Sequence, residues 1–506
     1  MYRQHVLRDV VHVDLGPPPA GVTAKEWAAE KALWERVLAP DYRQWEEEVK
    51  RIGGCAHPIH LTGPVRLVDS ITGEIVRELG NGGRTTLMVP CSNRRREWCA
   101  PCSRVYQWDT WHLVKAGLVG GKGMPESVAE HPRAFVTLTA PSFGPVHVVS
   151  EDDPCHPRRG SGQCEHGRPL ACWEQHSPDS PLVGQALCPG CYDYAGAVLW
   201  NAHASRLWHR FTDLMRRQEL PRAAGITRAE FARAVRVSFF KVAEYQRRGL
   251  VHFHAVIRLD PAAADGTVPG WATHELISAA VHQAASLARL TTPYSPAGEW
   301  ELGFGAQVDV QPMPVINTAD EGQIPNAVAS YIAKYVTKGV EDAGIVHRPL
   351  YCKECHGSGL GGACPRCHGS GLRISPAELP GSLHARSMVG TAARLGGLSE
   401  YRDLKLRRWA HQFGYGGHFS TKSRSYSTTM TALRQARTDF KTEQLREHLG
   451  LVGELIVDSE LSFAKAGYAS KTEEQIAEGI RDAIEENRIE GRAALADLRA
   501  EEEDWI

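Results

Sequence analysis

The sequence lacks long apolar runs. No stretch of the 506 residues approaches the roughly 20 apolar residues that span a membrane, and the opening Met-Tyr-Arg-Gln-His has no apolar secretory segment. These absences predict a cytoplasmic protein that does not associate with a membrane. The chain also has no glycine-rich loop ending in Lys-Ser or Lys-Thr, which excludes a helicase domain of the P-loop type.

The chain has almost no net charge, because 58 lysines and arginines oppose 59 aspartates and glutamates, which leaves a formal charge of −1. The charges are unevenly distributed: the middle of the chain is rich in arginine and lysine, and residues 472–506 are rich in acidic side chains. Local basic patches, not the total charge, determine whether a protein binds nucleic acid. The neutral total therefore does not exclude a nucleic-acid-binding protein, and the length predicts two to four domains.

Cysteine is plentiful, with thirteen residues, and in a reducing compartment this favours metal ligation over disulfides. The clearest pattern pairs Cys352-Lys-Glu-Cys355 with Cys364-Pro-Arg-Cys367, and each pair is followed by His-Gly-Ser-Gly-Leu. Four thiolates on two such knuckles suit tetrahedral Zn2+. We therefore predict a structural zinc ion at Cys352, Cys355, Cys364 and Cys367.

Two further cysteine groups predict zinc. In the first group, Cys99-Ala-Pro-Cys102 opens a helix expected over 103–116. Two alternatives to a four-cysteine zinc site stay open: the cysteines are free and buried, or His57 or His60 replaces Cys55 as a ligand. Its expected ligands are Cys55, Cys91, Cys99 and Cys102. The second lies in 151–194, where Pro, Gly and Ser cannot build an apolar core, so one or two zinc ions would supply cohesion. Its expected ligands, with their pairing left open, are Cys155, Cys164, Cys172, His176, Cys188 and Cys191. The total expected is two to four zinc ions.

The run Leu250–Leu259 is typical of a buried strand. Its side chains alternate between faces, so His252 and His254 point the same way. Residues 235–246 are expected to pair with this strand through a turn at Arg247-Arg248-Gly249, which brings Glu244 close to the two histidines. Two imidazoles and a carboxylate suit Mg2+ or Mn2+ and would leave open coordination positions on the bound ion. The alternatives are two core histidines without a metal, or Gln246 as the third ligand.

A helix is predicted over residues 327–338. Tyr331 and Tyr335 are four residues apart and share one helical face, and Lys334 and Lys338 each follow a tyrosine by three residues. A phenol can attack a phosphodiester held on a metal, while a lysine neutralises developing charge. The alternative is an amphipathic helix whose tyrosines pack inward.

Basic residues predict contacts to DNA phosphates in three places. Three consecutive arginines lie inside the first cysteine loop, two lie in the turn before His252, and four basic residues lie among aromatic residues of the 376–435 segment. Interleaved aromatics suit stacking on single-stranded bases, although a solvated basic face is the alternative. The expected contacts are Arg94, Arg95, Arg96, Arg247, Arg248, Arg407, Arg408, Lys422 and Arg424.

Three motifs occur in a fixed order: Phe135-Val-Thr-Leu-Thr139, His252-Phe-His254, and Tyr331-x3-Tyr335-x2-Lys338. In this order they resemble the His-hydrophobic-His (HUH) endonuclease superfamily, and in particular the rolling-circle replication initiators of actinobacterial plasmids and integrative elements, in the two-tyrosine form. The resemblance implies metal-dependent nicking of one strand at a plasmid origin. Tyr331 or Tyr335 would hold the 5′-phosphate, and the second tyrosine would allow strand transfer. A host helicase and a host polymerase would be partners.

The resemblance also implies an α+β fold, in which a central five-stranded antiparallel sheet with flanking helices has the His252 strand in its middle. Strands expected near residues 135, 237, 251 and 305 are consistent with this fold. We expect a helix and zinc module over 1–118, an endonuclease domain over 119–345 with a zinc insertion at 151–194, a double-knuckle module over 346–375, a basic and aromatic segment over 376–435, and a helical acidic tail over 436–506. In the first of these, apolar residues at helical spacing predict a helix over 23–50 that ends at Gly53-Gly54, and alternating runs at 65–68 and 74–78 predict a β-hairpin. Two alternatives stay open. One is a two-tyrosine transposase or relaxase, and the other is a non-catalytic zinc-dependent nucleic-acid-binding protein.

Overall fold

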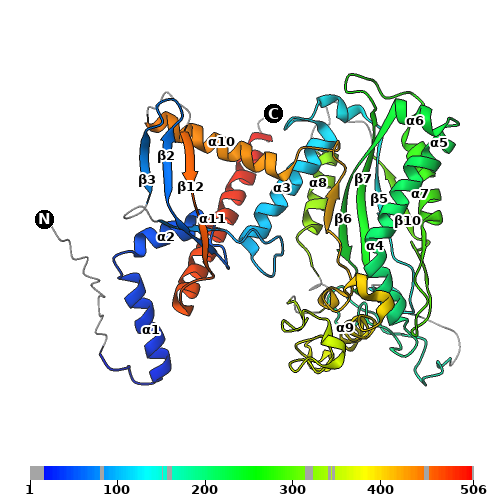
Figure 1. The fold of residues 1–506 in the computed structure, drawn as a ribbon, viewed down its shortest axis with the longest axis horizontal. Coiled ribbons are helices and arrows are strands. Elements are labelled where there is room, and N and C mark those ends of the chain that lie inside the picture. The colour runs from blue at the N-terminus through cyan, green and yellow to red at the C-terminus, as the bar shows by residue number, and fades with distance from the viewer. Residues whose placement is uncertain are drawn as a thin grey trace. The chain divides into compact units, whose positions relative to one another are not determined.

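A computed structural model describes residues 16–79, 85–150, 152–156, 162–313, 323–339, 344, 348–449 and 455–503. The fold is mixed α+β with antiparallel sheets (Figure 1). The chain forms two compact units: unit 1 comprises residues 1–108 and 431–506, and unit 2 comprises residues 109–430. The boundary at 108 falls inside helix α3 (Ala100–Val119). No helix in the described ranges is long and apolar enough to cross a bilayer.

Unit 1 begins with two helices, α1 (Ala24–Val37) and α2 (Tyr42–Arg51), where the sequence predicted one helix over 23–50. The interruption contains Pro40, which lacks an N–H donor and clashes with the preceding turn of a helix. Gly53 and Gly54 then adopt positive φ and end α2, as expected. Four strands follow: β1 (Ile59–Gly63), β2 (Val65–Asp69), β3 (Ile75–Leu79) and β4 (Thr85–Val89). The predicted hairpin of β2 and β3 is confirmed.

The C-terminal segment is not purely helical, which corrects the expected helical tail. It contains helix α10 (Met430–Leu449), strands β12 (Leu455–Ser459) and β13 (Ser462–Ala466), and helix α11 (Lys471–Glu503). Strand β12 pairs with β2, and β13 pairs with β1, giving two three-stranded sheets, β12-β2-β3 and β13-β1-β4. The physical reason is that β1 and β2 each present an edge whose backbone groups need partners, which two distant five-residue strands supply.

Unit 2 contains the five-stranded antiparallel sheet, in the order β10-β5-β7-β6-β11 (Figure 1). The strands are β5 (Arg133–Leu138), β6 (Val235–Tyr245), β7 (Val251–Pro261), β10 (Val308–Pro312) and β11 (Ser420–Lys422). The two-histidine strand β7 is central, as expected. The sequence predicted the first four strands but not β11, which lies in the basic and aromatic segment and pairs with β6.

Helices cover both faces of this sheet. On one face, Trp208 of α4 (Tyr194–Leu214) packs against Phe253, and α7 (His274–Leu287) joins the same core. On the other face, α8 (Gln323–Tyr335) lies beside His254. The remaining helical segments are η1 (Glu126–Glu130), the π-helix η2 (Met215–Glu219), α5 (Leu220–Ala223), α6 (Arg228–Ala234), η5 (Gly359–Gly362), η6 (Pro376–Glu378), α9 (Leu383–Leu395), η7 (Ser399–Leu404) and η8 (Ala410–Gln412). The short strands β8 (Arg289–Thr291) and β9 (Glu301–Gly303) form a separate pair.

Two fully buried arginines attach the end of α3 to the sheet. Arg133 donates to the carbonyl of Leu118, and Arg258 donates to the carbonyl of Gly117 and to the carboxylate of Asp260. The last carbonyls of a helix have no partner within it and carry the negative end of its dipole. Guanidinium groups therefore satisfy and neutralise this helix end inside the protein.

Candidate functional site

The register of the β6–β7 hairpin brings Glu244, His252 and His254 together. Glu244 lies directly opposite His252, and Val242 lies opposite His254, so all three site side chains project from one face of the sheet. Glu244 Oε2 is 2.9 Å from His252 Nε2 and 3.2 Å from His254 Nε2. The carboxylate thus lies between the two imidazoles.

The spacing of these atoms fits a divalent cation. One ligand atom from each of the three residues lies within 4.8 Å of the other two. An octahedral ion with ligands at about 2.1 Å has neighbouring ligand atoms about 3 Å apart, which matches the two distances to Glu244. Two imidazoles and one carboxylate leave three octahedral positions for water or substrate, as in metal sites that do chemistry.

The electrostatics of the site favour an ionised Glu244. Burial by itself would raise the pKa of this carboxyl, but hydrogen bonds from His252, His254 and Lys338 lower its pKa to about 2. Lys338 Nζ lies 3.1 Å from Glu244 Oε1. Burial also lowers the pKa of His254, which favours the neutral imidazole, the form that binds a metal.

Strand β5 supports His254 from the side. Thr137, opposite His254 in the sheet, places its Oγ1 3.0 Å from His254 Nδ1, and the Phe135 ring stacks on the imidazole at 5.8 Å. A partner on the second ring nitrogen sets the tautomer and orientation of a metal-binding histidine. Sequence reasoning did not assign this role to Thr137, although it lies in the first of the three ordered motifs.

Helix α8 places both tyrosines beside the histidines. The rings of Tyr331 and Tyr335 are each centred 5.4 Å from the His254 ring, and 4.5 Å from each other. Burial is the main cause that raises the pKa of Tyr331, although its side chain is still 40% exposed. Lys338 Nζ is 4.7 Å from the centre of the Tyr335 ring, whereas the exposed Lys334 is 6.0 Å away. The predicted helix is confirmed, but it ends at Tyr335, three residues before Lys338.

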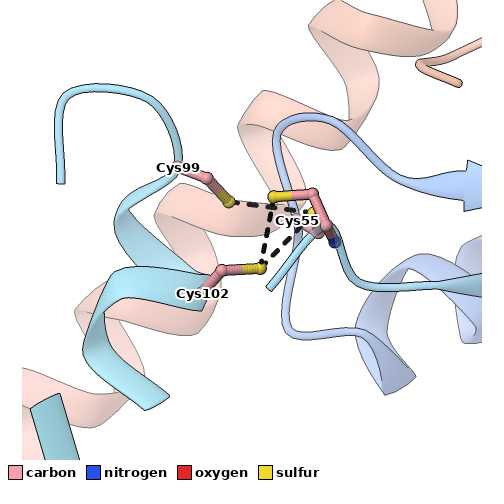
Figure 2. A group of neighbouring side chains, drawn as sticks. Cys55, Cys99 and Cys102 are labelled. Carbon is pink, nitrogen blue, oxygen red and sulfur yellow. Dashed lines mark hydrogen bonds between the residues drawn. The ribbon is translucent and has the colours of Figure 1, made fainter. Parts of the chain in front are cut away.

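The first cysteine group assembles in unit 1. Cys99 and Cys102, at the start of α3, point toward Cys55 (Figure 2). The Sγ atoms of Cys55 and Cys99 are 3.7 Å apart, those of Cys55 and Cys102 are 3.6 Å apart, and those of Cys91 and Cys102 are 3.7 Å apart. Zinc–sulfur bonds of about 2.3 Å in a tetrahedron place the sulfurs about 3.8 Å apart, so the four thiols fit Zn2+. His60 bonds the carbonyl of Gly467 instead.

The double knuckle has the same geometry. Its Sγ atoms are 3.9 Å apart for Cys352 and Cys364, and 3.7 Å apart for Cys355 and Cys367. All four side chains are buried, and all thirteen cysteines of the chain are free of disulfides. The four thiols therefore form a closed site that can hold zinc.

The cysteines and histidines of residues 147–194 gather into two groups, each of which could hold one ion. Each group has four side chains whose ligand atoms lie within 4.8 Å of one another. The first contains His147, Cys155, Cys172 and His176, and the second contains Cys164, His166, Cys188 and Cys191. His147 Nδ1 lies 3.0 Å from His176 Nε2, whereas His156 bonds the carbonyl of Val146. His147 escaped sequence reasoning because it precedes the cysteine-rich stretch and belongs to no local motif.

The predicted DNA-contact residues are divided between the two units. In unit 1, Arg95 contacts Asn93 and Trp98, and Arg96 is exposed; Arg94 is half-buried. In unit 2, Arg247, Arg408 and Arg424 are exposed. Three others are occupied by backbone carbonyls: Arg248 donates to Ala140 and Pro141, Arg407 to Ser358 and Ala393, and Lys422 to Ser427.

Comparison with known proteins assigns the chain to the replication initiator proteins. A protein described as "Replication initiator protein" from Streptomyces ambofaciens is 40% identical over 476 residues, which cover 91% of this chain and 94% of the relative. Residues 41–482 match the family model RepSA, described as "Replication initiator protein, pSAM2". The chain belongs to this RepSA family. No solved structure matches it.

Proposed function

We propose that this protein starts plasmid replication by nicking one DNA strand at an origin through a covalent phosphotyrosine intermediate. The observation that carries the proposal is the position of Tyr331 and Tyr335, each with its ring 5.4 Å from the ring of His254 in the Glu244–His252–His254 group. Two phenols and a cation site lie together on one face of the sheet. The family membership supports a role at an origin, and origin DNA is the proposed partner.

Glu244, His252 and His254 would hold Mg2+ or Mn2+, which when bound polarises the phosphoryl oxygens of the scissile phosphodiester. A tyrosine phenol oxygen forms a bond to phosphorus while the bond to the 3′ oxygen breaks. The phenol proton is transferred to the departing 3′ oxygen, so the products are a 5′-phosphotyrosine and a 3′-hydroxyl. That hydroxyl would prime synthesis by a host polymerase, with unwinding by a host helicase.

The surrounding side chains have separate roles in this scheme. Lys338 contacts Glu244 and lies over the Tyr335 ring, so its ammonium group would stabilise negative charge as the phenol oxygen loses its proton. Lys334 is exposed and would contact a neighbouring phosphate. The second tyrosine would cleave again when the displaced strand returns to the origin, and the four cysteine-rich groups would hold structural zinc.

The test is a denaturing gel of the full chain with labelled single-stranded DNA from its own replicon and Mn2+. We expect a covalent adduct with the parent and with each single variant, Tyr331→Phe or Tyr335→Phe, and no adduct with the double variant. Tyr294→Phe is the matched control, since Tyr294 is 80% exposed and absent from the site. An adduct that persists in the double variant, or intact DNA binding without any adduct in the parent, would contradict nicking and favour a non-catalytic DNA-binding protein.

A further inference from the structure

A second region of unit 2 is strongly basic and lies outside the candidate nicking site. Residues 205–236 contain eight arginines, no lysine and three acidic residues. This segment covers the second half of α4, η2, α5, α6 and the start of β6. All eight arginines are exposed. The sequence total of almost zero hides this local charge.

Few of these arginines are neutralised. Asp213 pairs with Arg217 at 2.7 Å and with Arg216 at 3.4 Å, and Glu219 pairs with Arg222 at 2.6 Å. The third acid, Glu230, caps helix α6 through Thr227. Arg233 interacts electrostatically with Glu230. The other four arginines have no carboxylate partner in the described part of the chain: Arg206, Arg210, Arg228 and Arg236.

The arginines line two neighbouring hollows. One, of about 760 Å³, is lined by Arg206, His209 and Arg210 together with Asp213 and the β8 strand. The other, of about 420 Å³, is lined by Arg216, Arg217, Arg228 and Arg236. From Arg206 to Arg217 the helix advances about 16 Å at 1.5 Å per residue. Phosphates repeat about every 3.4 Å along a DNA strand, so this length spans about five of them.

The part of this surface on α4 lies on the opposite side of the sheet from the histidines, whereas Arg236, at the far end of β6 from Glu244, follows the alternation of the Glu244 face. Trp208 of α4 packs on Phe253. Because side chains alternate along a strand, α4 covers the face of the sheet opposite to the one that carries His252 and His254. The aromatic residues of the same segment, Trp208, Phe211 and Phe231, are buried. Single-stranded DNA is bound by exposed aromatics that stack on bases, whereas a duplex offers mainly its phosphates. The surface therefore suits a duplex backbone.

We propose that Arg206, Arg210, Arg216, Arg217, Arg228 and Arg236, here named the arginine surface, bind the phosphate backbone of duplex DNA. The proposal deepens the proposed function, on which the choice of DNA as partner rests, because it gives the protein a duplex contact apart from the site that nicks a single strand. Binding here is independent of metal and of both tyrosines. Guanidinium groups suit this task because they form paired hydrogen bonds to phosphate oxygens.

The test uses the full chain with Arg206, Arg210, Arg228 and Arg236 all changed to glutamine. Fluorescence anisotropy follows binding to a 20-base-pair duplex and to a 20-nucleotide single strand, over a range of KCl concentrations. Each phosphate contact contributes about −0.9 to the slope of log affinity against log salt, so we expect the slope for the duplex to become shallower by about 3 to 4. Duplex affinity should fall at least tenfold, and adduct formation on single-stranded DNA should stay at the parent level.

Two matched variants accompany the test. Lysine at the same four positions keeps the charge and should retain most of the duplex affinity. Arg168→Gln with Arg373→Gln removes exposed arginines elsewhere in unit 2. This variant should keep the slope of log affinity against log salt within about 0.9 of the parent value, which is the contribution of one phosphate contact. Each variant should unfold at the same temperature as the parent, which would confirm that its fold is intact.

Two outcomes would overturn the arginine surface: an unchanged duplex slope in the glutamine variant, or a loss confined to the single strand. The proposed nicking fails separately, if the parent itself forms no adduct while its duplex binding shows the expected salt slope.

Discussion

The Glu244–His252–His254 group and the Cys352–Cys367 group hold their ligands in opposite ways. The first group projects from two eleven-residue strands, and the buried core beneath them supplies the rigidity. The second group has almost no apolar support of its own, because the buried cluster inside the module consists of the four cysteines alone. The comparison predicts that the sheet would position Glu244, His252 and His254 whether or not a metal is bound, whereas the double knuckle would need a metal to keep its shape.

The largest expected effect is on the double knuckle. Cys364→Ser should remove one zinc ion per chain and unfold the module, because zinc binding to such sites supplies about 10–16 kcal/mol of folding free energy. Zinc analysis and limited proteolysis over 350–372 measure the two effects. Arg366→Gln, an exposed change between the ligands, should alter neither, and a stable module without zinc would break the comparison.

The next prediction concerns His147, the candidate zinc ligand that sequence reasoning missed. His147→Ala should lower the zinc content by one ion, because it removes one of four ligands in the His147–Cys155–Cys172–His176 group. His156→Ala is the control, since His156 lies beside Cys155 but bonds a backbone carbonyl. Equal zinc content in both variants would show that the 151–194 segment holds its ions in another arrangement.

His252→Ala tests the other half of the comparison, the group that projects from the sheet. It should reduce the rate of nicking by roughly 10³-fold or more, because it removes a proposed ligand of the cation that would polarise the phosphate. The zinc content should stay unchanged, and the melting temperature should move by only a few degrees, since the sheet does not depend on this ion. Mn2+ binding by calorimetry and the adduct assay measure this, and nicking at the parent rate would refute the metal assignment.

A smaller effect is expected at Thr137. Thr137→Val keeps the shape of the side chain but removes the hydroxyl that contacts His254, and loss of such a partner typically weakens metal affinity by about 10- to 100-fold. Thr139→Val, one residue beyond the end of β5, is the matched control, because the Thr139 hydroxyl donates to the carbonyl of Gln307 instead. Equal Mn2+ affinity in the two variants would show that Thr137 does not position His254.

The smallest effect is an acid sensitivity of the sheet itself. Burial alone would raise the pKa of Asp260, but hydrogen bonds from His131, Arg258 and Ser238 lower it to about 2, from an ordinary value near 3.8. A carboxyl whose pKa is lower in the folded state stabilises the fold above the ordinary value and loses that contribution as pH falls toward 2. The loss is about 2 kcal/mol at 1.36 kcal/mol per pKa unit.

Urea unfolding of the parent and of Asp260→Asn between pH 5 and pH 2 tests this. The stability advantage of the parent should shrink below pH 4, while zinc loss at low pH affects both proteins equally. A constant difference between the two proteins over this range would contradict the role of Asp260.

Much of the candidate site followed from short-range patterns. Alternation along a strand predicts that His252 and His254 share a face, the tight turn at Arg247–Gly249 predicts Glu244 beside them, and helical spacing predicts that Tyr331 and Tyr335 share a face. What could not be predicted is that α8 lies on the histidine side of the sheet. That depends on packing between segments about 80 residues apart, and no local pattern encodes it.

The sequence alone determined the features that arise from local geometry. These are the knuckle spacing of Cys352–Cys367, the hairpin that carries Glu244, and most strands of the five-stranded sheet. The tertiary structure decided the features that need distant segments to meet. They include His147 as a ligand, the closing of both unit 1 sheets by β12 and β13, and the exposed arginines of α4 on the face away from the histidines. The physical reason is that dihedral periodicity acts over a few residues, whereas ligand sets and sheet edges are completed by whichever chain segment packs beside them.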